Sequence, residues 1–220
     1  MQTKNIKLNL RLKLTMTEKM DTTVGVATLD DAQGILNALK RNLIEIRGVD
    51  KISKKQRKDL EEEGFLRKEV DLEYYKELIE EPYTDIYIAK NKSGKIIGFA
   101  SIHRKKYDIV KVRDVIGNLT FENEKAKDLL LNEEIEFAYL DQISILPEYK
   151  RKGIGTIIFQ EALSILDVPI VAFVVEEPIF NKASVYWHEH NGFILEAISD
   201  GEYKGESFKF LIYVNWNSIK

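Results

Sequence analysis

Alternation of apolar and polar residues predicts strands in several parts of the chain. In residues 6–14 every second side chain is apolar, which predicts a half-buried strand ahead of the rest of the fold. Residues 170–175 are almost entirely apolar, as in a strand that is buried on both faces. By the same patterns and their flanking turn residues, the other strands are expected at 24–28, 85–90, 95–103, 136–146, 193–199 and 208–216.

Apolar residues at helical spacing predict the helices between these strands. Asp30 or Asp31 is expected to cap a helix that continues to about Ile46. Residues 51–80 are expected to be helical and highly charged. Because opposite charges lie close together there, a solvated helix face is favoured over a nucleic-acid surface. The remaining helices are expected at 123–132, at 155–166 and from Asn181 to Gly192.

Composition and charge narrow the possible classes of protein. A chain of 220 residues with 44% apolar content suits one globular domain with a substantial core. We expect that domain at 21–220, after an N-terminal extension, 1–20, whose extra strand adds to the sheet or completes a homodimer. The long connection 104–135 is of the kind that often forms a binding loop or lid. A net charge of −3 gives no support for nucleic-acid binding.

Further features that the sequence lacks exclude other kinds of chemistry. The chain has no cysteine, so it has no disulfide, no thiol nucleophile and no cysteine zinc site. No apolar run approaches membrane-spanning length, so no membrane partner is expected. The N-terminus lacks the apolar core of a signal peptide, and a cytoplasmic location is therefore expected.

The most informative stretch is 139–166, in which a strand, a basic loop and an apolar-periodic helix follow one another. The loop, Lys150–Gly155, carries two glycines, which allow the backbone to approach a ligand closely. The helix start that follows presents unpaired N–H groups and a partial positive charge, so the segment suits an anion. A Walker loop has a longer glycine spacing, and Ile158 stands where a dinucleotide fingerprint needs its third glycine. A tight strand-to-helix turn with surface lysines is the plainer alternative.

Together with a later segment, this loop resembles the GNAT (Gcn5-related N-acetyltransferase) superfamily. The family's acetyl-CoA loop reads Gln/Arg-x-x-Gly-x-Gly/Ala after a strand that ends in Val-x-Pro. Here Ile145-Leu146-Pro147 precedes Lys150–Gly155, with lysine in place of Gln/Arg as a mild departure. The family's later pattern, Asn-x-x-Ala/Ser and then Gly-Phe, is matched by Asn181, Ser184 and Gly192-Phe193.

The resemblance covers about 24–216, and Thr28–Ala32 also resembles the family's first strand-to-helix turn. It implies an α/β fold of GNAT type, with a mixed, mostly antiparallel, twisted sheet flanked by helices on both faces. The strand at 6–14 would be an extra N-terminal element. Acetyl-CoA is implied as the cosubstrate, and it should enter where two central parallel strands diverge.

The resemblance also implies which residues bind acetyl-CoA. The backbone N–H groups of the loop would hold the pyrophosphate, its basic side chains would add charge, and the Thr156 hydroxyl would add a donor. A bulge in the preceding strand would leave backbone groups free for the pantetheine arm, and the Ile145 N–H is the candidate oxyanion donor. Asn181 would cap its helix and contact the CoA arm. The expected cofactor-binding residues are Ile143, Ser144, Ile145, Lys150, Arg151, Lys152, Gly153, Ile154, Gly155, Thr156 and Asn181.

Two residues of the strand before the loop match family positions of the catalytic base. Strict alternation places Tyr139, Asp141, Ile143 and Ile145 on one face of this strand. Family bases recur four and six residues before Ile145, at Asp141 and Tyr139. Asp141 is an ionisable group among apolar neighbours, which would raise its pKa toward a useful range. The alternative is a carboxylate that only binds the substrate amine.

The second candidates for the base, and the candidate for the acid, lie farther along the chain. Glu176 and Glu177 end the next strand, where a solvated strand end explains them equally well. The family usually has a tyrosine four residues before the glycine of Gly-Phe, and here that residue is His188. A histidine can protonate the leaving thiolate, because its unperturbed pKa lies near neutrality. The alternative is a residue that interacts with the helix dipole.

Other histidines and a nearby tyrosine are expected to lie outside the chemistry. His188 and His190 are two residues apart and do not share a helix face, so no metal is expected. Tyr186 lies about 200° around the helix from His188 and should point elsewhere. His103 stands at the end of a strand from which it could reach the substrate side, although an ordinary strand-end histidine is favoured.

The expected reaction is direct transfer of an acetyl group from acetyl-CoA to a primary amine, without an acyl-enzyme and without a metal. A catalytically weak module that binds acyl-CoA for regulation is the alternative from another class, and an acyltransferase that uses a longer acyl-CoA is a third. Polyamine, amino acid, antibiotic, protein N-terminus and lysine all stay open as acceptors.

Overall fold

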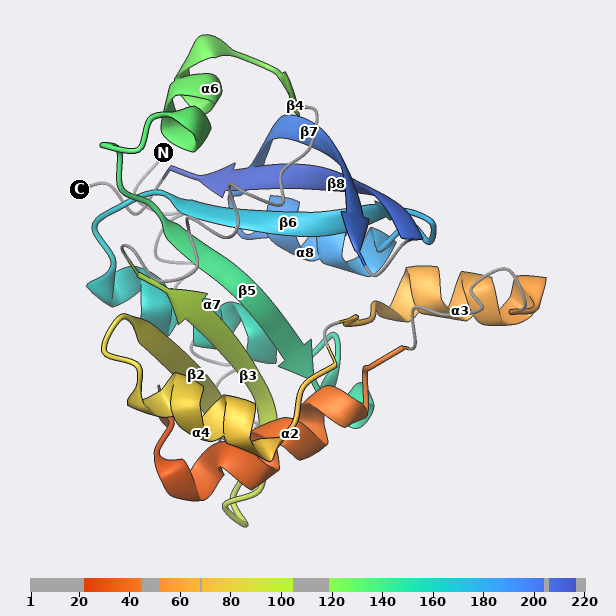
Figure 1. Ribbon diagram of the computed structural model, residues 1–220. Coiled ribbons are helices and arrows are strands. Elements are labelled where there is room, and N and C mark those ends of the chain that lie inside the picture. The colour runs from red at the N-terminus through yellow and green to blue at the C-terminus, as the bar shows by residue number, and fades with distance from the viewer. Residues whose placement is uncertain (1–21, 45–51, 68, 105–118, 204–205, 217–220) are drawn as a thin grey trace, which may run out of the picture.

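The computed structural model describes residues 22–44, 52–67, 69–104, 119–203 and 206–216. Their strands are β1 (Thr23–Val26), β2 (Thr84–Lys90), β3 (Ile96–His103), β4 (Leu119–Phe121), β5 (Ala138–Ile145), β6 (Ile170–Glu177), β7 (Ile194–Tyr203) and β8 (Glu206–Asn215). They form one eight-stranded sheet in the order β1-β2-β3-β5-β6-β8-β7-β4 (Figure 1). All neighbouring pairs are antiparallel except β5 and β6, which are parallel. The strand predicted at 6–14 lies outside the described residues, and with it the basis for the expected homodimer.

Helices lie on both faces of this sheet, which confirms the predicted fold class (Figure 1). One face is covered by α2 (Ala32–Lys40) and α4 (Leu72–Glu80), and the other by α7 (Ile154–Ile165) and α8 (Lys182–His190). α6 (Glu124–Leu131) packs near β4 and β7. α3 (Lys54–Glu63) has no buried residue and projects from the body of the molecule (Figure 1). Among the described residues, no helix has the length and apolar content needed to cross a membrane.

α2 is shorter than the helix predicted from the sequence. It ends at Lys40, whereas the periodicity extends to Ile46. The chain turns after Lys40 so that Asn42 and Ile44 can pair with Leu66. The Asn42 carbonyl accepts from the Leu66 N–H, and the Ile44 N–H donates to the Leu66 carbonyl, each at 2.9 Å. Pairing with a distant segment therefore overrides helical propensity here.

The charged region 51–80 is divided into two helices instead of one helical stretch. Gly64 follows α3 with a φ of +74°, a conformation that glycine adopts readily and that ends the helix. Asp71 then caps α4, because its side chain accepts a hydrogen bond from the Tyr74 N–H at 2.9 Å. The segment between the helices, Phe65–Arg67, is thereby free to cross the molecule as an extended chain.

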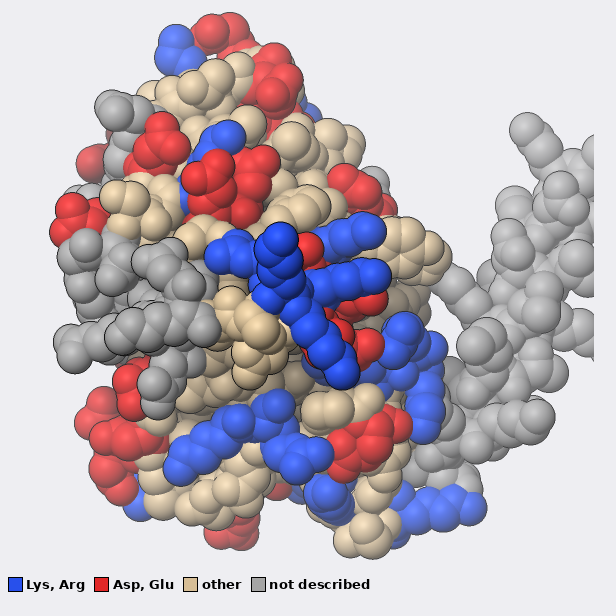
Figure 2. Space-filling view, turned by 90° about the vertical axis from the view of Figure 1, so that its right-hand side faces the viewer, with Lys and Arg blue, Asp and Glu red and all other residues tan. Residues whose placement is uncertain are grey.

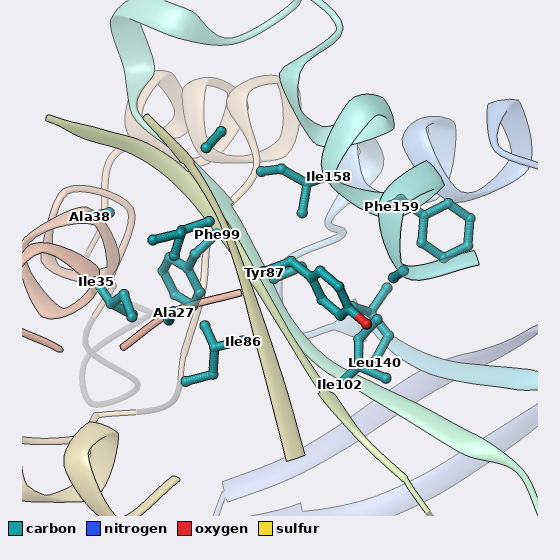
Figure 3. Packing of buried hydrophobic residues seen from close by; sticks show 14 of the residues in the cluster. Ala27, Ile35, Ala38, Ile86, Tyr87, Phe99, Ile102, Leu140, Ile158 and Phe159 are labelled. Carbon is teal, nitrogen blue, oxygen red and sulfur yellow. The ribbon is translucent and has the colours of Figure 1, made fainter. Parts of the chain in front are cut away.

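Apolar side chains fill the space on both sides of the sheet (Figure 3). On the α2 side, the helix and the sheet contribute Ile35, Ala38, Ile86 and Phe99. On the α7 side, the corresponding residues are Tyr87, Ile102, Leu140, Ile158 and Phe159. Full burial of an aliphatic or aromatic side chain of this size contributes roughly 1.5–3 kcal/mol to folding. The two layers hold β5 in a fixed position, and this strand forms one wall of the candidate site.

The connection 104–135 contributes a strand that the sequence pattern did not predict. β4 pairs with β7 at the edge of the sheet, with Leu119 opposite Ser199. The helix expected in this connection is present as α6, and Asn123 caps it by accepting from the Ala126 N–H at 2.8 Å. A three-residue strand is too short to show alternation, so only its neighbour β7 reveals it.

Candidate functional site

A cleft opens in the middle of the sheet where β5 and β6 separate. The two strands pair only between Ala138–Leu140 and Ile170–Ala172. Beyond Leu140, β5 continues beside β3, while β6 continues beside β8. The cleft has a volume of about 860 Å³. Its position agrees with the expectation that a ligand enters between two diverging parallel strands.

Asp141 is the extra residue of a β-bulge in β5. In the pairing with β3, Leu140 lies opposite Ile102 and Gln142 lies opposite Ser101, so one step along β3 corresponds to two along β5. A bulge of this kind bends the strand and changes the direction of its side chains. Asp141 lines the cleft as a result.

The prediction that Tyr139 shares one face of β5 with Ile143 is wrong, because the bulge lies between them. This residue pairs with His103, and residues that lie opposite each other share a face of the sheet. Ile143 lies on the opposite face, against α7, where its Cδ1 would be 3.4 Å from a Cβ added to Gly155. Strict alternation does not extend through a bulge, because the extra residue shifts its phase by one position.

The loop between β5 and α7 adopts two left-handed residues. Arg151 has a φ of +60° and Gly153 a φ of +79°, and Gly153 is also the N-cap residue of α7. A Cβ added to Gly153 would meet nothing within 4 Å, so the backbone is open on that side. Most of the predicted loop residues line the cleft: Lys150, Arg151, Gly153, Ile154, Gly155 and Thr156. Lys152 is not among them and donates instead to the Glu148 carbonyl at 2.8 Å.

Glu63, at the end of α3, contacts two basic residues of this loop. Its carboxylate accepts from Arg151 Nη2 at 2.7 Å, and its carbonyl accepts from Lys150 Nζ at 2.7 Å. Burial lowers the pKa of the Lys150 amine, and the nearby Arg151 cation acts in the same direction. Figure 2 shows the side of the molecule on which α3 lies, where basic and acidic side chains stand close together. An anion of the protein itself therefore lies at the predicted phosphate loop.

The segment after α3 crosses the cleft and joins its two walls. On one side, the Phe65 carbonyl accepts from Asn181 Nδ2 at 3.0 Å. On the other side, Leu66 forms a parallel bridge with Leu43. Asn181 also caps α8, because its Oδ1 accepts from the Ser184 N–H at 3.3 Å, as the residue type predicted. No local sequence signal indicates that this segment lines the cleft, since its partners are more than 20 residues away.

Asn42 holds the end of β5 and is another residue that sequence reasoning missed. Its Nδ2 donates to Ser144 Oγ at 2.8 Å and to the Ile145 carbonyl at 3.0 Å. Ser144 Oγ in turn donates to the Ala38 carbonyl at 3.2 Å. These contacts fix the cleft-lining part of β5 against α2, although β6 no longer pairs with it.

Asp141 lies beside a buried histidine from the neighbouring strand. His103 Nε2 is 3.6 Å from Asp141 Oδ2, and the two side chains are 0% and 10% exposed. On the other side of the ring, His103 Nδ1 is 2.9 Å from Thr84 Oγ1. The plain interpretation of His103 as an ordinary strand-end residue therefore overlooks its contact with the candidate base.

The other candidates for the base lie away from the cleft lining. Tyr139, Glu176 and Glu177 are not among the described residues that line it. Tyr139 stacks on His103 with ring centroids 6.0 Å apart. Glu176 forms an ion pair with Lys209 at 3.0 Å, and Glu177 is exposed at the strand end. Of the four predicted candidates, Asp141 alone is a cleft-lining carboxylate.

His188 is packed inside the protein at the inner end of the cleft. The side chain is 3% exposed, and its ring lies 4.9 Å from that of Phe193 and 5.9 Å from that of Tyr213. Nδ1 is 2.7 Å from the Ser184 carbonyl, so this nitrogen carries the proton of the neutral ring. Burial lowers the pKa of His188 from 6.5 to about 4. At neutral pH the ring is therefore uncharged, with the lone pair on Nε2.

The outer part of α8 forms the rim of the cleft. Tyr186 is 72% exposed and lines this rim, so it points away from the buried His188, as its place on the helix predicted. It stacks on His190 at 6.2 Å between ring centroids. Trp187 packs against α7 so closely that a Cβ added to Gly155 would lie 2.9 Å from its Nε1. The second loop glycine is thus required by packing between α7 and α8.

The split sheet, the glycine loop at a helix start and the cleft between them define an acetyltransferase-type α/β fold. The family model described as Acetyltransferase (GNAT) family matches residues 49–193, and the chain belongs to this family. This confirms the resemblance that the loop and the Asn181 segment indicated. No curated protein sequence matches the chain significantly.

Solved structures show the same fold at low sequence identity. Arabidopsis thaliana NAA60 in complex with acetyl-CoA is 15% identical, with a TM-score of 0.54 over 88% of this chain and 98% of that one. A spermidine N-acetyltransferase chimera that includes Vibrio cholerae SpeG is 17% identical, with a TM-score of 0.53 over 90% and 96%. The ribosomal-protein-S18-alanine N-acetyltransferase from Escherichia coli is 12% identical, with a TM-score of 0.54 over 88% of this chain and 92% of that one.

Proposed function

We propose that this protein transfers an acetyl group from acetyl-CoA directly to a primary amine. One observation carries the proposal: the cleft that separates β5 from β6 is lined both by the glycine loop and by the carboxylate of Asp141. The loop suits the phosphates of a cofactor, and the carboxylate suits an amine that must lose a proton. The family and the acetyl-CoA complex of a protein with the same fold support the choice of cofactor.

In this proposal the cofactor lies along the cleft with its pyrophosphate at the loop. The N–H groups at the start of α7 and the cations of Lys150 and Arg151 would face the phosphate oxygens. The pantetheine arm would run along the edge of Ile143–Ile145 that faces β6, where the two strands no longer pair. Asn181 would contact the same arm from α8.

The reaction needs two proton transfers besides the transfer of the acetyl group. The amine nitrogen attacks the thioester carbon, a C–N bond forms, and the C–S bond breaks as the tetrahedral intermediate collapses. The Ile145 N–H would donate to the oxyanion, and Asp141 would take the proton that the nitrogen releases. The CoA thiolate must then receive a proton.

His188 is the proposed donor of that proton, provided that its buried ring first becomes protonated. The neutral ring has no proton on Nε2, because Nδ1 donates to the Ser184 carbonyl. A thiolate formed beside the ring would raise the pKa of His188, since an opposite charge favours the protonated form; Nε2 would then take up a proton from solvent and pass it to the sulfur. Solvent is the alternative donor, and the low pKa of the ring also favours the second candidate function, a catalytically weak module that binds acyl-CoA.

Gly153→Asp should weaken acetyl-CoA binding at least about tenfold, which corresponds to about 1.4 kcal/mol. The new carboxylate would extend into the open space beside the loop and repel the pyrophosphate. Gly153→Asn is the matched control, because asparagine has the same shape without the charge and tolerates a positive φ. Calorimetry with acetyl-CoA measures both variants. Equal affinity of the aspartate variant and the native chain would exclude the loop as the phosphate site.

Glu63→Gln should strengthen acetyl-CoA binding by about twofold to fivefold, the size of one exposed ion pair. The substitution removes the carboxylate that competes with a phosphate for Arg151. Glu62→Gln is the control, since Glu62 precedes Glu63 on α3 but pairs with Lys58 at 3.8 Å. If Glu63→Gln weakens binding instead, Glu63 supports the loop and does not compete with the ligand.

The transfer itself is tested by release of free CoA thiol from acetyl-CoA in the presence of a panel of amines. The panel should include polyamines, free amino acids, aminoglycoside antibiotics and peptides with a free N-terminus or a lysine. Turnover of any of them supports the proposed acetyltransferase activity. Tight acetyl-CoA binding with no turnover supports a regulatory module. Faster turnover with longer acyl-CoAs would mean that the acyl donor is a longer acyl-CoA and not acetyl-CoA.

A further inference from the structure

Three neighbouring strands bring together Thr84, His103 and Asp141. Thr84 of β2 lies directly opposite His103 of β3 in the sheet, and the hydroxyl is 2.9 Å from His103 Nδ1. The other ring nitrogen, Nε2, is 3.6 Å from Asp141 Oδ2. Both Thr84 and His103 are buried, so the arrangement extends from the interior to the wall of the cleft.

The bulge explains how this contact is possible. Asp141 is the additional residue of β5 between the positions opposite Ser101 and Ile102. An unbroken strand would place neighbouring side chains alternately on the two faces. The bulge instead places the carboxylate within reach of a histidine from the next strand and also beside the cleft.

The remaining titratable groups around this contact are uncharged or paired. The Tyr139 ring stacks on His103. Tyr75 of α4 donates its hydroxyl to Gln142 Oε1 at 2.7 Å, and burial followed by nearby charges, Asp141 among them, raises the pKa of this tyrosine. Asp85 and Arg104, at the same end of β2 and β3, pair with each other at 2.8 Å. His103 is thus the group best placed to interact with the carboxylate of Asp141.

We propose that His103 is a positioning residue that holds the Asp141 carboxylate ionised and aimed into the cleft, with Thr84 fixing the ring. The inference rests on the proposed function for its catalytic meaning. The Thr84 hydroxyl donates to Nδ1, which leaves the proton of the neutral ring on Nε2, facing Asp141. That N–H stabilises the charged form of the carboxylate through Oδ2 and leaves Oδ1 for the amine. The distance of 3.6 Å is longer than a hydrogen bond, and catalytic contacts of this kind often tighten only in the complex with substrate.

The contact can be measured without any substrate. In a chain with ¹³C-labelled aspartate side chains, the Asp141 signal is assigned by its loss in Asp141→Asn and then followed by NMR as a function of pH. Removing a donor from a carboxylate disfavours the charged form, so in His103→Leu the midpoint of this titration should move up by about half a pH unit or more. His103→Gln places a side-chain N–H near the position of Nε2 and should restore most of the shift. Thr84→Val should move the midpoint in the same direction as His103→Leu.

Ile102→Val is the matched control, because it disturbs the packing of the same strand without removing a polar group. An unmoved titration in a folded His103→Leu variant overturns the inference, whether or not the chain transfers acetyl groups. If the native chain turns over an amine, His103→Leu should lower kcat/KM about tenfold or more and move the acidic limb of its pH profile upward. His103→Gln should recover part of both. A shifted titration with an unchanged pH profile would also overturn the positioning role.

Discussion

Asp141→Asn should reduce kcat/KM for an accepted amine by about 100-fold or more, the usual contribution of a general base. Asparagine keeps the size of the side chain but cannot take up a proton. A 100-fold loss corresponds to about 2.7 kcal/mol of transition-state stabilisation. Affinity for acetyl-CoA should stay within a few-fold of the native value, because the glycine loop is unchanged. Thiol release and calorimetry measure the two quantities separately.

The remaining candidates for the base provide the controls for this experiment. Tyr139→Phe, Glu176→Gln and Glu177→Gln each remove an ionisable group without a large change in volume. None of the three lines the cleft among the described residues, and each should therefore keep most of its activity. A larger loss in one of them than in Asp141→Asn would move the proton-accepting role to that residue. Loss of acetyl-CoA binding in Asp141→Asn would mean that the carboxylate supports the cleft and not the proton transfer.

Local sequence signals predicted the parts of the site that local structure creates. The glycine loop is predicted by the succession of a strand, a proline and two glycines that are two residues apart. Gly153 does adopt the positive φ that such a turn requires. The N-cap of α8 follows from the preference of asparagine for that position, and Asn181 makes the expected bond. Most of the strands were predicted for the same reason, since their alternation is visible within a few residues.

The direction of side chains on β5 could not be predicted from alternation alone. One extra residue at Asp141 moves Tyr139 to the opposite face from Ile143, and no residue type in β5 marks the place of the bulge. The bulge exists in the pairing with β3, so only the partner strand reveals it. The contact between Asp141 and His103 could not be predicted for the same reason, although each residue by itself is a candidate for the site.

Contacts between segments far apart in the sequence explain the other differences between the structure and the prediction. Glu63 reaches Lys150 and Arg151 across more than 80 positions of sequence, and it does so because Gly64 ends α3 at that point. The sequence pattern predicts a solvated helix around Glu63 and a phosphate loop at Lys150 and Arg151, and it indicates no contact between the two. Their contact depends on how the segment after α3 is held between Leu43 and Asn181.

The spacing to Gly192 predicts that His188 takes the place of the family tyrosine, and the structure shows the surroundings of its side chain. The imidazole ring is enclosed by Phe193 and Tyr213 and has its one proton directed at the Ser184 carbonyl. Enclosure of this kind penalises the charged ring, which makes His188 a group that links folding to pH as well as a candidate for catalysis.

Lowering the pH from 8 to 4.5 should cost the native chain about 2 to 3 kcal/mol of folding stability through His188 alone. The folded pKa is about 4 and the ordinary value is 6.5, so the unfolded chain binds the proton first. The stabilising contribution is therefore complete above pH 6.5 and is lost as the pH falls toward 4. His188→Phe has no proton to bind and keeps an aromatic ring between Phe193 and Tyr213. The loss of stability over this pH range should be smaller in this variant by the same 2 to 3 kcal/mol.

Urea unfolding at several pH values between 8 and 4.5 measures this difference. Carboxylates also titrate in the lower part of the range, but they are shared by both chains and cancel in the comparison. His190→Gln is the control, because His190 is exposed on the same helix and its removal should leave the pH dependence unchanged. If His188→Phe loses as much stability on acidification as the native chain, the pKa of His188 is the same in the folded and unfolded chain, and burial does not lower it. If the native chain instead loses less stability than His188→Phe, the pKa of the ring is raised in the folded chain. Only in that second case is the ring largely protonated near neutral pH, so that it can donate a proton to the thiolate without help from the bound cofactor.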